Sequence, residues 1–348
     1  MFKLKVLVPS LAIIILAGAI GGLLIGLLAT GVWNPSWNPF GLSPQQSFEK
    51  SIKNLSDLKT CKIDGKVEVE VKSEKEPPQT FFVSLSGSFQ IDKTDIENVK
   101  SEGNLSLNFG TEGLEISLAS EFKNIGEDLY LKVISLPTLP FFGAILNQLK
   151  DQWVKIDREA LIKMSGQKPE EIEKEEQERQ QMMEELINLF KEKRILEVKE
   201  KLRDEEIQGI KTHHYLVNVV REELKALIPQ FFQKMEEYIP QDQKEKLQEF
   251  LKEFPQKFDE IYDKIGEITF EVWIGEKDYY LRKIKGEKEL DLSKFEQLKG
   301  SEAEKMKLKI SFEVGLSEFN QKKEVVSPEE FKPLEEVLPS WPGLEKTE

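Results

Sequence analysis

Apolar and polar residues alternate with a period of two along several segments of the chain. In residues 63–71, isoleucine and valine share the odd positions with one glycine, while charged residues fill the even positions. The same alternation recurs at 81–91, 105–109, 114–122 and 306–316. A period of two is typical of strands that present one apolar face and one wet face.

The early strands follow one another so closely that no crossover helix fits between them, and the glycine-bearing connection 110–113 suits a hairpin. They are therefore predicted to be antiparallel. About ten strands in all exceed what a flat sheet usually carries, which favours a curved half-barrel. The remaining predicted strands are 128–134, 152–156, 212–220, 267–274 and 279–284.

Helical patterns interrupt the strands. Ser43 followed by Pro44 is typical of a helix start, and this first helix is expected to run to about Asp57. Later segments carry apolar stripes at helical spacing and are predicted to cover the apolar face of the sheet. The fold class is therefore α+β, a curved antiparallel sheet covered by amphipathic helices inserted at 139–150, 168–203 and 221–265.

An uncharged apolar run at 6–32 is long enough to span a bilayer and too long for a typical cleaved signal peptide, the alternative that it leaves open. Lys3 and Lys5 precede it, so the positive-inside rule puts the N-terminus in the cytoplasm. A single-pass protein of the cell membrane, with its main domain extracytoplasmic, is expected. The predicted organisation is a cytoplasmic stub 1–5, an anchor 6–32, a tether 33–43, one domain 44–338 and a flexible tail 339–348.

The composition excludes several classes of function. Asp and Glu total 63 against 49 Lys and Arg, and this acidic excess argues against a nucleic-acid partner. The single cysteine forms no intramolecular disulfide, and no nucleotide-binding or hydrolase motif is present. His213 and His214 are adjacent on a predicted strand, so they point to opposite faces and cannot share a metal. We expect no enzyme activity, no catalytic residue, no metal and no cofactor.

The order of elements resembles the LolA-like superfamily, which includes mycobacterial glycolipid-carrying lipoproteins. This resemblance implies a half-barrel with helices at its mouth and an apolar cavity that holds lipid acyl chains. The chain departs from the family in lacking a lipidated cysteine after its apolar run and in having long helical insertions. The resemblance rests on the first helix and on segments 65–69 (GKVEV), 126–132 (GEDLYLK), 153–157 (WVKID), 214–217 (HYLV) and 271–275 (EVWIG).

Two functions follow from these patterns. The first is binding of a lipid or other apolar molecule between the sheet and its covering helices. The alternative is a non-enzymatic envelope scaffold whose half-barrel is filled and which binds other envelope proteins through the charged segment 168–203. The predicted lipid-binding residues are Phe81, Val83, Leu85, Leu107, Phe109, Ile116 and Leu118 on the sheet, with Phe141, Phe142, Phe231 and Phe232 at the opening.

Overall fold

The computed structural model forms two compact units. Among the residues that the structure describes, no helix is both long and apolar enough to span a bilayer. Three predicted segments lie wholly or mostly outside the described residues: the anchor 6–32, the insertion 139–150 except for its last two residues, and most of the insertion 168–203. The structure describes residues 42–73, 78–95, 98–136, 149–157, 181, 185, 193–236, 241–295 and 305–337.

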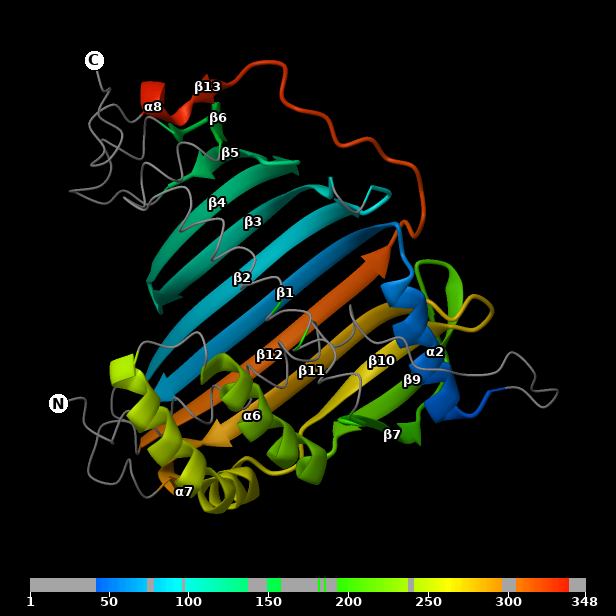
Figure 1. Ribbon diagram of the computed structural model, residues 1–348, viewed down its shortest axis with the longest axis vertical. Helices are drawn as coiled ribbons and strands as arrows, with labels where there is room; N and C mark the ends of the chain where they lie inside the picture. Colours follow the sequence, from blue (N-terminus) through cyan, green and yellow to red (C-terminus); the bar gives the residue numbers. More distant parts are fainter. Residues whose placement is uncertain are drawn as a thin grey trace. The chain divides into compact units, whose positions relative to one another are not determined.

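The first unit contains an antiparallel sheet in the order β7-β9-β10-β11, with a short strand β8 paired to β9 (Figure 1). Val217 and Ile274 of this sheet have no exposed surface, so its apolar face is core. A one-turn helix, η4 (Leu292–Lys294), follows β11. The strands are β7 (Leu196–Lys201), β8 (Glu205–Ile207), β9 (Ile210–Val219), β10 (Thr269–Gly275) and β11 (Leu281–Asp291).

Strand β7 corrects the prediction that the insertion 168–203 is helical to its end. Its residues alternate between half-buried Leu196 and Val198 and exposed Glu197 and Lys199. The strand pairs with β9, with Leu196 opposite Val219. Glutamate and lysine favour a helix locally, but pairing with a sheet edge overrides that weak preference.

Helix α2 (Pro44–Ser56) begins as predicted, with a reciprocal capping box. The Ser43 hydroxyl accepts a hydrogen bond from the Gln46 amide at 3.2 Å, and the Gln46 side chain accepts one from the Ser43 amide at 2.9 Å. Near its other end, the Asn54 side chain donates to the carbonyls of Asp278 and Tyr279. The helix is thereby tied to the turn between β10 and β11.

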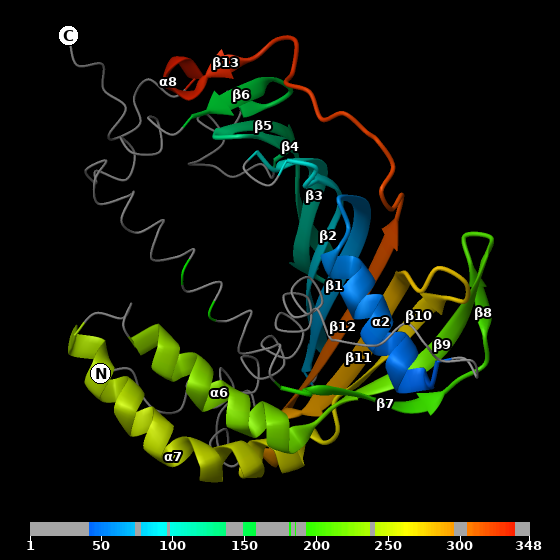
Figure 2. The ribbon, with the colours of Figure 1, turned by 45° about the vertical axis from the view of Figure 1, so that its right-hand side comes forward.

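Helices α6 (Arg221–Met235) and α7 (Gln241–Ile265) confirm the helical prediction for 221–265 and lie side by side (Figure 2). Arg221 of α6 binds Asp259 at 3.0 Å and Asp263 at 2.7 Å, and Lys225 also binds Asp259. A ladder of rings, each 5.3–5.6 Å from the next between centroids, follows the pair: Phe232, Phe250, Phe254, Phe258 and Tyr262.

The second unit contains a sheet in the order β13-β6-β5-β4-β3-β2-β1-β12. The strand pairings from β2 to β6 are antiparallel, whereas β13 is parallel to β6. The antiparallel strands and the α+β class are therefore confirmed. The strands are β1 (Thr60–Ser73), β2 (Gln79–Asp92), β3 (Lys100–Thr111), β4 (Leu114–Ile125), β5 (Asp128–Ser135), β6 (Trp153–Ile156), β12 (Met306–Ser317) and β13 (Lys332–Pro333).

The segment after β12 turns back along the second unit and was not predicted. The Asn320 amide donates to the Thr60 carbonyl at 2.9 Å, and the Thr60 hydroxyl donates to the Gln321 carbonyl at 2.8 Å. Further on, the Val326 carbonyl accepts from Lys123 at 2.9 Å. The segment ends in β13 and a single helical turn, α8 (Leu334–Val337), which packs on Val154.

We expect Asp259→Asn to lower the thermal midpoint of unfolding. The hydrogen bond from Lys225, and after it that from Arg221, holds the pKa of Asp259 below its usual 3.8. A lowered carboxyl pKa stabilises the fold above pH 3.8 and ceases to do so as the pH falls through the lowered value. The difference between wild type and variant should therefore be present at neutral pH and vanish in strong acid.

Thermal unfolding followed by circular dichroism at both pH values measures this effect. Glu249→Gln, an exposed carboxylate on the same helix, is the matched control. A variant difference that persists unchanged in strong acid, or an equal effect of Glu249→Gln, would contradict the assignment.

Candidate functional site

The predicted sheet residues meet on one face of β2, β3 and β4. Val83 lies opposite Phe109, which lies opposite Ile116. One step along, Leu85 lies opposite Leu107, which lies opposite Leu118. Directly paired residues share a face of the sheet, so these side chains form two rows that cross three strands. We call Phe81, Val83, Leu85, Leu107, Phe109, Ile116 and Leu118 the apolar wall.

The apolar wall is not packed as a core. Phe81 is 44% exposed and Leu85 is 40% exposed, and the other five side chains are half-buried. In contrast, Val217 and Ile274 in the first unit are 0% exposed. Contiguous apolar side chains left accessible on a folded protein mark a surface for an apolar ligand or partner.

The wall ends at a pair of aromatic rings. Phe89 and Phe122 lie on either side of Gly103 in the register, and their ring centroids are 5.7 Å apart. A Cβ atom added at Gly103 would overlap the Ser88 carbonyl and would contact Phe89. Glycine is required here because any side chain at this position would overlap the backbone carbonyl of Ser88.

The opposite face of the same strands is polar and charged. Lys132 pairs with Glu121 at 3.6 Å, and Lys155 pairs with Asp128 at 2.9 Å. The hydrogen bond to Asp128 raises the pKa of Lys155, and burial raises the pKa of Tyr130. The raised pKa keeps Lys155 charged over the neutral range, so its pair with Asp128 stays intact there.

The residues predicted at the opening belong to other parts of the chain than the apolar wall. Phe231 and Phe232 belong to α6 of the first unit, where both are half-buried and contact each other at 5.5 Å between centroids. Phe141 and Phe142 lie outside the described residues. Within the second unit, the seven sheet residues of the predicted set share one face of the sheet. The place of the four phenylalanines at an opening stays a prediction.

The sequence prediction of lipid-binding residues omitted two exposed leucines on the same face as the apolar wall. Leu105 and Leu114 have the same strand parity as the wall residues and are 36% and 63% exposed. Their signal was the same period of two that identified the others. They extend the exposed apolar surface along β3 and β4.

The histidines point to opposite faces of β9, as predicted. His213 contacts Asp204 at 3.3 Å, whereas His214 contacts Glu271 at 2.7 Å and stacks on Trp273 at 4.2 Å between centroids. In the part of the chain that the structure describes, no three His, Cys, Asp or Glu side chains are placed to hold a metal ion. Cys61 is buried, and burial raises the pKa of its thiol, which disfavours a nucleophilic thiolate.

No protein-family model matches the chain, and no curated protein matches it. A comparison with solved structures finds lipoprotein LppX of Mycobacterium tuberculosis, at 12% identity and a TM-score of 0.31, over 80% of this chain and 96% of that one. LprF of Mycobacterium bovis matches at 12% identity and a TM-score of 0.35, over 82% of this chain and 96% of that one. A LolA superfamily protein of Nitrosomonas europaea matches at 8% identity and a TM-score of 0.19, over 82% of this chain and 96% of that one.

These matches include a mycobacterial lipoprotein and a LolA superfamily protein, the groups that the sequence resembles. All three TM-scores are below 0.5, so the chain paths agree only loosely. The function of those proteins does not transfer to this chain on that basis.

An open wall should tolerate truncation better than a core does. We expect Leu85→Ala to lower the free energy of unfolding by less than about 1 kcal/mol, because much of the side chain is already in water. Leu316→Ala, in β12 of the same unit and 5% exposed, should cost about 2–5 kcal/mol. Urea unfolding of both variants measures the difference. Equal losses would mean that Leu85 is packed as core.

Proposed function

We propose that the chain binds a lipid acyl chain, or another apolar molecule of similar shape, on the apolar wall. The observation that supports this proposal is the pair of cross-strand rows formed by Val83, Phe109 and Ile116 and by Leu85, Leu107 and Leu118. These rows present aliphatic and aromatic groups and leave them accessible. The LolA-like resemblance of the sequence implies the same class of ligand.

The chemistry of the wall suits a hydrocarbon chain. The wall side chains carry no hydrogen-bonding group, so they offer a ligand apolar contact without directional bonds. Each methylene removed from water contributes about 0.8 kcal/mol, so ten buried methylenes contribute roughly 8 kcal/mol. A gross energy of that size reaches about micromolar affinity before the cost of ordering the chain is subtracted.

We further propose that the domain is extracytoplasmic and is held at the membrane by residues 6–32. The support is the length of this uncharged run and the two lysines before it. A lipid-binding wall tethered close to a bilayer has its ligand within reach.

A photoreactive fatty acid with a diazirine on its acyl chain tests lipid binding in the full chain within a membrane. Crosslinked peptides should cover 81–85, 105–109 and 114–118 as well as 6–32. Leu85→Glu should reduce the crosslinks on the strands by about tenfold or more, because an acyl chain would have to desolvate the new carboxylate. Crosslinks to 6–32 provide an internal control for lipid loading.

Ser86→Glu is the matched variant, since Ser86 lies on the other face of β2. It should leave the strand crosslinks unchanged. Crosslinks confined to 6–32 in the wild type would refute lipid binding and direct the search to envelope protein partners. An equal loss in both variants would mean that the substitutions disturb the strand rather than a ligand.

Cysteine labelling tests the location. The only native thiol, Cys61, is 5% exposed and should react slowly. Glu112→Cys places an exposed thiol in the turn between β3 and β4. A membrane-impermeant maleimide added to intact cells should label this variant well above the wild type. Labelling that requires lysis of the cells would put the domain in the cytoplasm.

A further inference from the structure

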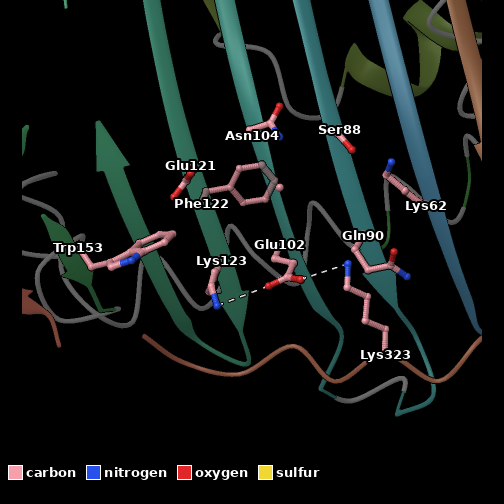
Figure 3. Close-up of a pocket in the computed structure, with 11 residues that line it drawn as sticks. Lys62, Ser88, Gln90, Glu102, Asn104, Glu121, Phe122, Lys123, Trp153 and Lys323 are labelled. Carbon is pink, nitrogen blue, oxygen red and sulfur yellow. Dashed lines mark ion pairs between the residues drawn. The ribbon is translucent and has the colours of Figure 1, made fainter. Parts of the chain in front are cut away.

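A pocket of about 250 Å³ opens on the polar face of the second unit, opposite the apolar wall. Its side chains come from β1, β2, β3, β4 and β6, and Lys323 of the segment after β12 also lines it (Figure 3). The volume is below the usual range for drug-sized ligands, so the pocket suits a small molecule. The polar side chains that matter for recognition are Ser88, Gln90, Glu102, Asn104, Glu121 and Lys123.

Gln90 is the feature that points to a ligand. It is 4% exposed, and neither polar atom of its side-chain amide has a hydrogen-bond partner among the described residues. Leaving a buried amide without a partner is costly, and native proteins rarely do so without a reason. Figure 3 shows Gln90 among the residues that line the pocket, with the amine of Lys323 drawn between Gln90 and Glu102. An amide both donates and accepts, so its partner must offer a donor and an acceptor close together.

The charged groups of the pocket already have partners. Glu102 pairs with Lys123 at 3.5 Å and with Lys323 at 3.7 Å. Two other charged residues of the lining have partners outside the pocket. Lys62 pairs with Asp64 at 3.2 Å, and Glu121 pairs with Lys132 at 3.6 Å. An anion or a cation would have to compete with these pairs. A neutral ligand that is rich in hydrogen-bonding groups would not.

Trp153 supplies an apolar surface within this polar lining. The indole of Trp153 lines the pocket, while Asn104 and Ser88 lie in the same cross-strand row as Trp153. A sugar ring has hydroxyl groups along its rim that donate and accept, and C–H groups on its faces that pack on an aromatic ring. Adjacent hydroxyls satisfy both halves of an amide or both oxygens of a carboxylate.

We infer that this pocket binds a neutral sugar of one or two rings. Gln90 hydrogen-bonds to a pair of hydroxyls, Asn104 binds a further hydroxyl, and Trp153 packs against a ring face. The inference is independent of lipid binding, because none of the seven residues of the apolar wall lines the pocket, although Phe122 at the end of the wall does.

Saturation-transfer NMR on the full chain in phosphatidylcholine nanodiscs tests this inference. The probes are glucose, N-acetylglucosamine and maltose at millimolar concentration, with inorganic phosphate and acetate as competing anions. At least one sugar should receive saturation and should not be displaced by either anion. No transfer to any of the three sugars, or displacement by phosphate or acetate, would overturn the proposal.

Two variants and a control locate the binding. Asn104→Ala removes an exposed side chain and should weaken the sugar by about tenfold, whereas Asn108→Ala, on the same strand and face outside the pocket, should not. Gln90→Leu should also lose binding while its thermal midpoint stays equal or rises, because the unpartnered amide is gone. Binding that survives both pocket variants, or that Asn108→Ala weakens equally, would overturn the proposal.

Discussion

Side chains along β2, β3 and β4 point alternately to the two faces of the sheet, and the antiparallel register keeps the three strands in phase. Val83, Phe109 and Ile116 fall on one face because each is paired directly with the next. A slip of one residue in β3 or β4 would move its leucines to the charged face and its glutamates to the apolar face. Both surfaces of the second unit therefore depend on this single register.

The two units use similar strands in different ways. In the first, Val217 and Ile274 are fully buried and α2 is tied to the turn after β10. An edge-to-face ring contact and ion pairs join α6 to α7. In the second, the middle strands leave their apolar side chains accessible. Apolar residues on an accessible surface contribute less to the stability of the fold than buried ones do. An accessible apolar surface of this kind is typical of a binding site.

Local patterns predicted the elements, because a period of two and a Ser-Pro helix start act over a few residues. They failed at β7, whose glutamates and lysines favour a helix until β9 supplies a pairing edge. The apolar wall could be predicted, since apolar alternation survives in the sequence. The polar pocket could not. In the sequence, the polar residues of the pocket look like an ordinary solvent-exposed strand face: Ser88, Gln90 and Asn104. Lys323 comes from a distant segment, whose path depends on hydrogen bonds between Asn320 and the backbone of Thr60 and Lys59.

Gly103 has a consequence beyond its steric role. It lines the polar pocket on one side, while the ring of Phe89 lies close to its backbone on the other. A Cβ atom at this position would overlap the Ser88 carbonyl, and Ser88 also lines the pocket. The same atom would contact Phe89, which pairs with Phe122 at the end of the apolar wall. Any larger residue at position 103 would therefore disturb both faces of the sheet together.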